Sequence, residues 1–345
     1  MNDRITIVGG GLAGLTLGIA LRRRHVPVEI WEAGKYPRHR VCGEFISGAG
    51  QATLKRLGLL AALPEDATRL ARTAAFFDEA RQVLPARRLP EAALCISRHV
   101  LDAELARVFQ SLGGTLREGQ RWVSSFDAGV VRATGRRPET HPDGWRWFGL
   151  KVHASGVELD ADLEMHFGSD GYVGLCRLPR NEINICGLFR SREPVPDLGR
   201  HWRNWLGGGP GSVLHGRLAN ATFDDRSFCS IAGISLVSHR AIDLEECCVG
   251  DALSMIAPVT GNGMSMAFES AELAAEALAR FAGGEVPWAA TKTAVARACD
   301  ARFNVRLRWA ARMQSALFQP AARRTLLWLG RRSEWIWREL IRLTR

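Results

Sequence analysis

The sequence lacks three features that would place it in a specialised class of protein. It has no run of about 18 apolar residues, so we expect no transmembrane helix. Its eight cysteines lie scattered, with Cys247 and Cys248 the only close pair, which argues against a disulfide framework or a CxxC metal site. The start, MNDRITIVGG, shows no basic segment followed by a cleavable apolar stretch. We therefore expect a cytoplasmic protein with reduced thiols and no metal site.

The composition is that of an ordinary globular protein. The 345 residues are 46% hydrophobic and 24% charged, enough to bury a large core in one domain or in two interlocked ones, and we expect two. The net charge is +10, but the basic residues are spread along the chain. Since a nucleic-acid surface needs a clustered basic patch, we expect no nucleic-acid partner. Nothing in the sequence indicates an oligomeric state.

An excess of arginine lies near the C-terminus. In ARRTLLWLGRRSEWIWRELIRLTR, arginine alternates with tryptophan and leucine at roughly helical spacing. Such a segment is either an interfacial amphipathic helix in contact with acidic lipid, or a packed helix with a solvated arginine face. Both interpretations stay open, so peripheral membrane contact through basic C-terminal helices is one expectation.

The first motif is ITIVGGGLAGLTLGIALRRRHVPVEIWE, close to the start of the chain. The β-branched run 5–8 predicts a buried parallel strand, and the periodicity of 15–24 predicts a helix. Residues 9–14 between them supply G-x-G-x-x-G. This order predicts a phosphate-binding turn that opens a helix.

Each glycine of this turn has a physical purpose. Gly9 permits the tight turn, Gly11 lets the backbone approach a pyrophosphate, and Gly14 lets helix and strand pack closely. The helix N-terminus faces the phosphate charge. The expected cofactor contacts here are Gly9, Gly11, Leu12, Ala13 and Gly14.

A second strand, 28–31, ends at an acid. Glu32 lies eighteen residues after Gly14, where a carboxylate can accept hydrogen bonds from a ribose diol and would repel a 2′-phosphate. The expected ligand is therefore an unphosphorylated adenosine dinucleotide, which leaves both NAD and FAD open.

A second glycine-rich site lies far downstream, in CCVGDALSMIAPVTGNGMSMAFESAELAAEALARF from Cys247. A strand ends in Gly250-Asp251, and a turn with Gly261 and Gly263 opens an alanine-rich helix. A carboxylate and a helix dipole in this order suit the ribityl hydroxyls and the flavin end of FAD. Alternatively, Asp251 only satisfies backbone donors at a helix start.

Together these sites resemble those of the FAD-dependent oxidoreductases of the p-hydroxybenzoate hydroxylase and geranylgeranyl reductase superfamily. Members share the N-terminal glycine loop and a late G-D followed by P-x-x-G-x-G. Three further segments match in the family's order: YPRHRVCGEFIS at 36–47, ISRHVLDAELA at 96–106 and GYVGLCRLPRNEINICGLF at 171–189. The resemblance implies FAD as cofactor and NADPH or NADH as electron donor. Beyond the first turn, the cofactor-binding residues it implies are Glu32, Ala33, Arg40, Cys42, Gly43, Arg98, Val123, Thr134, Gly135, Asp251, Pro258, Gly261, Asn262 and Gly263.

The resemblance also implies an α/β (α+β) fold. It would be a Rossmann-like FAD-binding domain of the glutathione-reductase type, with an inserted antiparallel β-sheet substrate domain and C-terminal helices. Alternating polar and apolar residues after Trp145 agree with such a sheet. The expected boundaries are 1–72, 96–140 and 245–284 for the discontinuous FAD-binding domain, 73–95 and 141–244 for the substrate-binding sheet, and 285–345 for the C-terminal helical segment.

Two departures from the family pattern bear on the reaction. Family hydroxylases carry A-D-G in mid-chain, whereas VVRATGRRP has Thr134, which supplies no fixed negative charge. This argues against efficient NADPH-driven hydroxylation. The W-x-W-x-I-P motif of flavin halogenases is absent, since WRWFG at 145–149 has only its tryptophans. This argues against halogenation.

The main functional hypothesis is a flavin monooxygenase that hydroxylates a hydrophobic aromatic or polyketide-type product. The alternative is a flavin-dependent reductase or dehydrogenase of isoprenoid or acyl chains, which the G-Y-x-G strands, Thr134 and the basic tail favour. A third is a flavin-binding protein without turnover. In each case the partner is a hydrophobic small molecule.

No catalytic side chain is obligatory, because the flavin ring itself transfers the electrons. Cys42 is either a redox partner or a small buried hydrophobe. Glu44 is either a proton acceptor or a solvated loop carboxylate. His153 and His166 lie in alternating strands, and we expect them at the surface.

Overall fold

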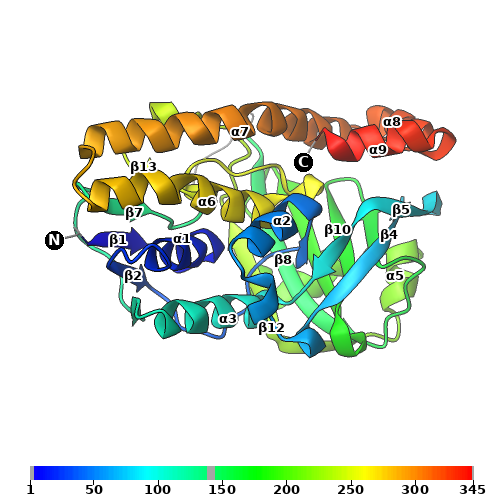
Figure 1. Cartoon of the computed structure of the whole chain (residues 1–345). Helices are drawn as coiled ribbons and strands as arrows, with labels where there is room; N and C mark the ends of the chain where they lie inside the picture. Colours follow the sequence, from blue (N-terminus) through cyan, green and yellow to red (C-terminus); the bar gives the residue numbers. More distant parts are fainter. Residues whose placement is uncertain (1–3, 138–143, 344–345) are drawn as a thin grey trace.

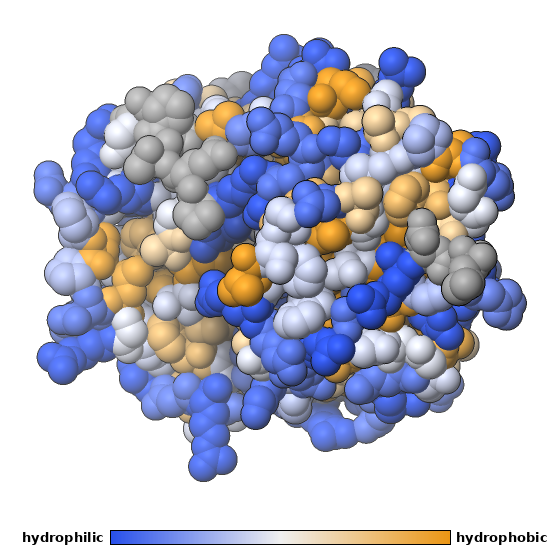
Figure 2. Space-filling view, turned by 90° about the vertical axis from the view of Figure 1, so that its left-hand side faces the viewer, coloured by the Kyte–Doolittle hydropathy of each residue, from blue (hydrophilic) through white to orange (hydrophobic). Residues whose placement is uncertain are grey.

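The computed structural model describes residues 4–137 and 144–343. Two β-sheets lie beside each other, and the C-terminal helices run along one side of both (Figure 1). The end of the molecule on the left of Figure 1 is mostly hydrophilic, with hydrophobic residues in separate patches (Figure 2). Within the described ranges, no helix combines the length and the hydropathy needed to cross a membrane. The expected domain boundary between 140 and 141 falls outside the described residues.

The first sheet is parallel and has five strands, in the order β13-β7-β1-β2-β6. The strands are β1 (Ile5–Val8), β2 (Val28–Glu32), β6 (Thr115–Glu118), β7 (Val130–Arg132) and β13 (Cys247–Cys248). Every residue of the central strand β1 is buried, as its apolar β-branched sequence predicts. Parallel strands bring their carboxyl ends to one edge of the sheet, so the turns that follow them meet there.

Helices α1 (Leu12–Arg22) and α3 (Arg98–Ser111) pack on this sheet and on each other, and α6 (Gly263–Ala282) packs on α1. Helix α1 begins three residues before the predicted start because Gly11 is its N-cap. The packing is close, since a Cβ on Gly18 would lie 2.8 Å from the Ile30 side chain. Helix α2 (Gly48–Arg56) packs on α6.

The second sheet has eight strands in the order β12-β8-β11-β10-β9-β4-β5-β3. They are β3 (Phe45–Ile46), β4 (Arg69–Phe77), β5 (Gln82–Cys95), β8 (Arg146–Ser155), β9 (Leu163–Phe167), β10 (Gly171–Arg177), β11 (Ile183–Ser191) and β12 (Thr222–Ala232). All neighbours pair antiparallel except β4 and β9, which are parallel. Strands β4 and β5 follow each other in the chain and pair antiparallel. Strand β3 comes from the first segment of the chain, so it ties the two sheets together.

Two short helices interrupt the strand-rich stretch after Trp145. They are α4 (Leu198–Leu206) and α5 (Val213–Leu218), and a glycine-rich loop, residues 207–212, joins them. Trp202 of α4 is buried in a hydrophobic cluster with residues of β8, β10 and β11. The sequence analysis expected strands and turns here and missed both helices.

The C-terminal part is helical, as predicted, and it is broken before Pro320. Helix α7 (Trp288–Leu317) packs on α6, and α8 (Pro320–Arg332) and α9 (Glu334–Arg342) pack on β5. Arg306 of α7 donates to the Glu269 carboxylate of α6 at 2.6 Å, and both side chains are buried. Trp337 of α9 is buried and its indole N–H donates to the carbonyl oxygen of Arg88 at 3.1 Å.

Candidate functional site

A cavity of about 1170 Å³ lies between the two sheets. Glu32 and Asp251, the acids expected at opposite ends of one cofactor, both line it. The predicted residues in its lining are Gly9, Gly11, Leu12, Ala13, Glu32, Ala33, Arg40, Cys42, Gly43, Arg98, Val123, Thr134, Gly135, Asp251, Pro258, Gly261 and Gly263. Of the predicted residues, all of which the structure describes, Gly14 and Asn262 lie outside this lining.

In the first glycine turn, Gly9 and Gly14 are required by packing, whereas Gly11 borders the cavity. Gly9 has a φ of +110°, and a Cβ there would lie 2.2 Å from the carbonyl oxygen of Ala133. A Cβ on Gly14 would lie 1.9 Å from the carbonyl oxygen of Gly9. Both positions therefore require glycine for packing. At Gly11 a Cβ would have no neighbour within 4 Å, so this glycine faces open cavity at the N-terminus of α1.

Glu32 at the end of β2 is held in place by two backbone N–H groups and by Arg38. Its carboxylate accepts from the Gly10 N–H at 2.8 Å, the Gly34 N–H at 2.7 Å and Arg38 Nη1 at 2.8 Å, and it forms an ion pair with Arg38 Nη2 at 2.7 Å. Burial alone would raise the pKa of Glu32, but the hydrogen bonds from Arg38 and Gly34 lower it below its usual range. The carboxylate is thus ionised and preorganised to accept from ribose hydroxyls.

The same end of the cavity is strongly cationic. The arginines in its lining are Arg38, Arg40, Arg98, Arg121, Arg132 and Arg136. The Nε atoms of Arg40 and Arg136 are buried and have no hydrogen-bond acceptor among the residues the structure describes. Buried donors normally have partners, and a phosphate oxygen would supply one. Together with the open cradle at Gly11, these donors fit the pyrophosphate of a dinucleotide.

Arg98 is fixed before any ligand binds. Its guanidinium makes two hydrogen bonds to the Asp102 carboxylate, at 2.6 and 2.8 Å. Burial acts to lower the pKa of Arg98, but the charge of Asp102 raises it above its usual range, so the cation is permanent. Arg98 lines the same cavity as Asp251. Burial raises the pKa of Asp251 to about 6, although Arg98 and Arg136 act in the opposite direction.

The second glycine turn forms the part of the cavity wall near Asp251. Gly250 and Gly261 have φ values of +63° and +65°. A Cβ on Gly261 would lie 2.2 Å from the ring of Phe45, so this turn packs directly on the segment after Cys42-Gly43. Helix α6 begins two residues later with its N-terminus at the cavity. The Asn262 carboxamide is turned toward Ser47, whose hydroxyl donates to it at 2.7 Å.

The remaining predicted residues include an exposed loop residue and an unreactive thiol. Thr134 and Gly135 follow β7, and Val123 is 90% exposed on the loop after β6. Burial raises the pKa of the Cys42 thiol, so the group is protonated. A protonated thiol is a poor nucleophile, which argues against a redox role for the half-buried Cys42.

The opposite end of the cavity is apolar. It is lined by Ala74, Ala75, Phe76, Leu84, Leu89, Leu163, Met165, Leu175, Leu188, Ile231, Ile234, Met313, Leu317, Leu327, Trp337 and Ile341, from strands of the second sheet, the segment after β12 and helices α7–α9. The carboxylate of Glu164, also in this lining, is already held by His166 at 3.0 Å and by Arg217 at 3.2 Å. This end therefore suits a neutral hydrophobic molecule.

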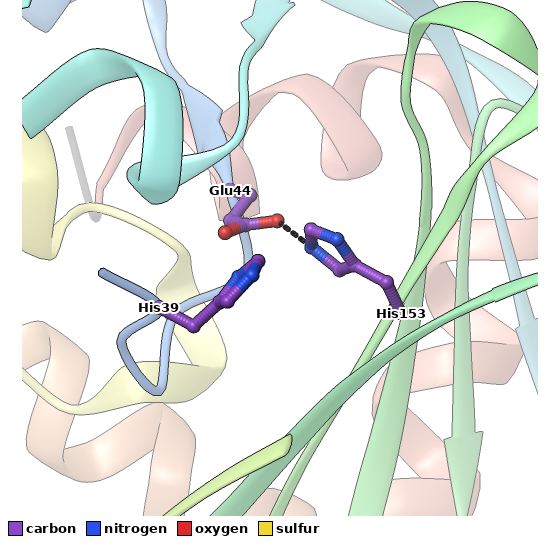
Figure 3. Close-up of side chains that lie close together, drawn as sticks. All are labelled: His39, Glu44 and His153. Atoms are coloured by element: carbon purple, nitrogen blue, oxygen red, sulfur yellow. Dashed lines mark hydrogen bonds and ion pairs between the residues drawn. The ribbon is translucent and has the colours of Figure 1, made fainter. Parts of the chain in front are cut away.

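A buried polar cluster adjoins the cavity, and the sequence analysis missed it. His153 and His166 were expected at the surface, and this expectation is wrong, because both side chains are buried. Glu44 is buried too, which excludes the solvated carboxylate, one of its two interpretations. Every residue of β8 between its two ends is buried, so the alternation of this strand does not mark a wet face. The Glu44 carboxylate lies beside the His39 and His153 rings (Figure 3). The spacing of Lys151 and His153, two residues apart on one strand, was the signal that could have revealed a shared face.

The comparisons with known proteins agree with this architecture. Residues 7–43 match the family model of an NAD(P)-binding Rossmann-like domain. No curated protein matches the sequence.

Solved structures with the same fold include the halogenase PltM, with a TM-score of 0.76 and 16% identity, over 97% of this chain and 80% of PltM. A geranylgeranyl bacteriochlorophyll reductase-like protein from Thermoplasma acidophilum has a TM-score of 0.75 and 16% identity, over 98% and 95% of the two chains. PqsL from Pseudomonas aeruginosa, described as a probable FAD-dependent monooxygenase, has a TM-score of 0.68 and 17% identity, over 95% and 99%.

One PltM structure, at 15% identity, is a complex with FAD. The predicted α/β architecture, a Rossmann-like unit joined to an antiparallel sheet and C-terminal helices, is confirmed. The chain has the fold of the FAD-dependent oxidoreductases to which its motifs pointed.

Proposed function

We propose that the protein is an FAD-dependent oxidoreductase that acts on a neutral hydrophobic small molecule. The observation that carries this proposal is the division of one cavity into a cationic, glycine-lined end and an apolar end. The first end matches the charge and hydrogen-bonding groups of FAD, and the second matches a substrate with few polar groups.

Residues in the cavity lining would hold most parts of the cofactor. The Gly11 turn with Arg40 and Arg136 would hold the pyrophosphate, Glu32 the adenosine ribose, and Asp251 with Arg98 the ribityl region. The N-terminus of α6 would lie near the flavin, where its dipole favours negative charge by about 0.5–2 kcal/mol. Bound flavin would supply the electron transfer, while the protein binds, orients and excludes water.

The reaction we propose first is hydroxylation of an aromatic or polyketide-type product, with NADPH or NADH as electron donor. Support comes from the aromatic rings of Phe76, Tyr172 and Trp337 in the cavity lining and from the shared fold of PqsL. Hydroxylation needs a substrate held near the flavin in a space shielded from water. The apolar end supplies that space.

The second candidate reaction is reduction or oxidation of an isoprenoid or acyl chain. The aliphatic and methionine side chains in the lining favour it, since they suit a long saturated or unsaturated chain. The shared fold of the geranylgeranyl reductase-like protein agrees with it.

One experiment tests both reactions. The purified protein is examined for a flavin absorption spectrum, its chromophore is released and identified, and reduction by NADH and by NADPH is followed with and without oxygen. Substrate-stimulated oxygen uptake supports hydroxylation, and anaerobic change of the substrate supports the second reaction. Bound FAD that neither nicotinamide reduces indicates a flavin-binding protein without turnover, and failure to take up FAD refutes the proposal.

We further propose that the protein is cytoplasmic and contacts an anionic membrane surface through α8 and α9. Trp328 and Trp335 are 51% and 71% exposed on these helices. The helices carry the basic residues Arg323, Arg324, Arg331, Arg332, Arg338 and Arg342, against the acids Glu334 and Glu339. Exposed tryptophan beside arginine suits the interface of acidic lipid.

Sedimentation with vesicles tests this contact. We expect binding to phosphatidylcholine vesicles that contain phosphatidylserine, and loss of binding in salt and in the double variant Trp328→Ala, Trp335→Ala. Equal sedimentation with and without phosphatidylserine, or no binding at all, would show that these helices only pack on the protein.

A further inference from the structure

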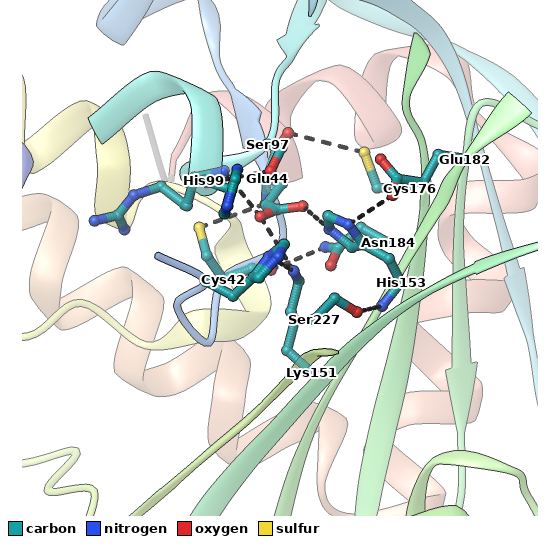
Figure 4. A network of polar contacts seen from close by, with 12 residues as sticks. Cys42, Glu44, Ser97, His99, Lys151, His153, Cys176, Glu182, Asn184 and Ser227 are labelled. Atoms are coloured by element: carbon teal, nitrogen blue, oxygen red, sulfur yellow. Dashed lines mark hydrogen bonds and ion pairs between the residues drawn. The ribbon is translucent and has the colours of Figure 1, made fainter. Parts of the chain in front are cut away.

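The cofactor turn around Cys42 and Gly43 is attached to the second sheet by a buried network of polar side chains (Figure 4). The Asn184 amide of β11 donates to the carbonyl oxygen of Cys42 at 2.9 Å. Lys151 and His153 of β8 reach Glu44, the next residue of the turn after Gly43. These contacts connect the segment that lines the cofactor end to the sheet that lines the substrate end.

Glu44 is the inner member of the network. It has a φ of +59°, a strained conformation for a residue with a side chain, and it is completely buried. Its carboxylate accepts from the Arg98 N–H at 2.9 Å, lies 2.6 Å from His153 Nε2 and lies 3.6 Å from Lys151 Nζ. The strained turn therefore depends on groups that satisfy one buried carboxylate.

His153 links this carboxylate to the surface. Its Nδ1 lies 3.0 Å from the Glu182 carboxylate, whose side chain is 41% exposed. Because both ring nitrogens face carboxylates, both must donate, and the ring is an imidazolium. Burial lowers the pKa of His153, but the two carboxylates raise it above the usual histidine value, with Lys151 acting against them.

A second histidine completes the surroundings of His153. The His39 ring meets the His153 ring edge to face at 5.1 Å, and Lys151 lies 2.9 Å from His39 Nδ1. Burial and the charge of Lys151 lower the pKa of His39 to about 4, so His39 is a neutral acceptor. The cluster thus contains the charges of Glu44 and Glu182 balanced by those of His153 and Lys151.

A metal ion is a poor alternative occupant. His39, Glu44 and His153 present ligand atoms within 4.8 Å of one another, as two histidines and a carboxylate do in metal centres. The ammonium group of the fully buried Lys151 already supplies the positive charge beside Glu44 and His39. A divalent ion there would be repelled by this lysine at short range in a medium of low polarity.

We propose that His153 is a positioning residue for the cofactor: its imidazolium, held between Glu44 and Glu182, fixes the Cys42-Gly43-Glu44 turn in the shape that binds FAD. This inference rests on the proposed function. Loss of the proton leaves Glu44 buried with one cationic partner fewer, which destabilises the turn. FAD affinity is therefore full below the raised pKa of His153 and falls as the pH rises through it.

Flavin titrations of the full-length apoprotein, from about pH 5.5 to about pH 9.5, test the inference. We expect FAD affinity to fall about tenfold across a transition above the ordinary histidine value of about 6.5. Glu182→Gln removes the outer carboxylate without touching the cavity, so the transition moves down by about one pH unit. Glu158→Gln, at an exposed carboxylate outside the network, serves as the matched control and keeps the wild-type profile.

His153→Gln should bind FAD weakly at every pH and lack the transition. Asp251 contributes a separate step near pH 6, which Glu182→Gln leaves in place. Circular dichroism at each pH confirms that the variants are folded. An unchanged transition in Glu182→Gln, or a flat wild-type profile, overturns the positioning role while FAD binding itself stands.

Nitrogen NMR of the His153 ring in the apoprotein separates this inference from the proposed function. We expect an imidazolium at neutral pH, with a pKa that rises further when FAD binds, because the two equilibria are reciprocally linked. A ring that titrates at or below the ordinary value overturns the inference. If the ring is protonated but the protein never takes up FAD, the proposed function and the cofactor role of His153 are refuted. The assignment of His153 as an imidazolium would still stand.

Discussion

The two ends of the cavity are built in different ways. The cofactor end consists of backbone turns at the carboxyl edge of a parallel sheet, with glycines and arginines in short segments of chain. The substrate end consists of side chains from strands and helices distributed over most of the chain. Chemistry that depends on a few consecutive residues is recognisable in sequence, whereas a surface assembled from distant side chains is not.

The largest expected effect is at Gly9, where the fold itself needs glycine. Gly9→Ala would force a Cβ to 2.2 Å from the Ala133 carbonyl oxygen at a φ of +110°. We expect a loss of about 3 kcal/mol or more in unfolding free energy and no retained FAD. Thermal melts followed by circular dichroism measure the loss. A melt like that of the wild type would show that the turn is not built as described.

Gly11→Ala isolates the cofactor end from the fold. The added methyl group would project into open cavity, so apoprotein stability should change by less than about 0.5 kcal/mol. FAD affinity should fall on the order of 100-fold, because the methyl takes the place of the approaching pyrophosphate. Flavin fluorescence titration measures this. Wild-type FAD affinity in this variant would show that the pyrophosphate does not bind at Gly11.

Asp251→Asn should separate function from stability. Because burial raises the pKa of Asp251 to about 6, the folded state binds a proton more tightly than the unfolded chain. Stability is therefore lost as the pH rises from about 4 to about 6, and the neutral amide should recover roughly 1–3 kcal/mol above about pH 7. FAD affinity should fall about tenfold. Urea unfolding of the apoprotein and flavin titration at matched pH test the two effects, and a destabilised apoprotein would contradict the first.

Met313→Trp changes the apolar end alone. Met313 lines the cavity from α7, and a larger ring should shorten the space for substrate. FAD affinity should stay within about twofold, while KM for the longest accepted substrate rises about tenfold. Met313→Leu, of similar volume, is the control. A change in FAD affinity would show that the two ends are not independent.

The smallest effect is expected at Cys42. Burial keeps its thiol protonated, so Cys42→Ser should keep FAD affinity and the rate of flavin reduction within about threefold. Stopped-flow absorbance measures the reduction. A loss of activity with intact FAD binding would restore the redox interpretation of this cysteine.

The sequence predicted the nucleotide-binding turn, the acid at the end of β2 and the late glycine turn. Each is a local arrangement in which backbone conformation limits the residues allowed, as at Gly9 with its positive φ. It did not predict the buried network, because Glu44 and His153 are 109 positions apart and each alone is typical of a solvated side chain. The helices α4 and α5 were also missed, since each is shorter than the window in which periodicity is clear.

Short-range constraints therefore determined the cofactor end: strand, turn, helix and acid follow one another within about thirty residues, and local sterics leave little choice. Tertiary structure alone decided that β8 is covered on both faces, that Glu44 lies beside two histidines, and that α9 places Trp337 in the wall of the cavity. These outcomes depend on which distant surfaces exclude water from each other. That balance of burial and charge is a property of the packed chain and not of any segment within it.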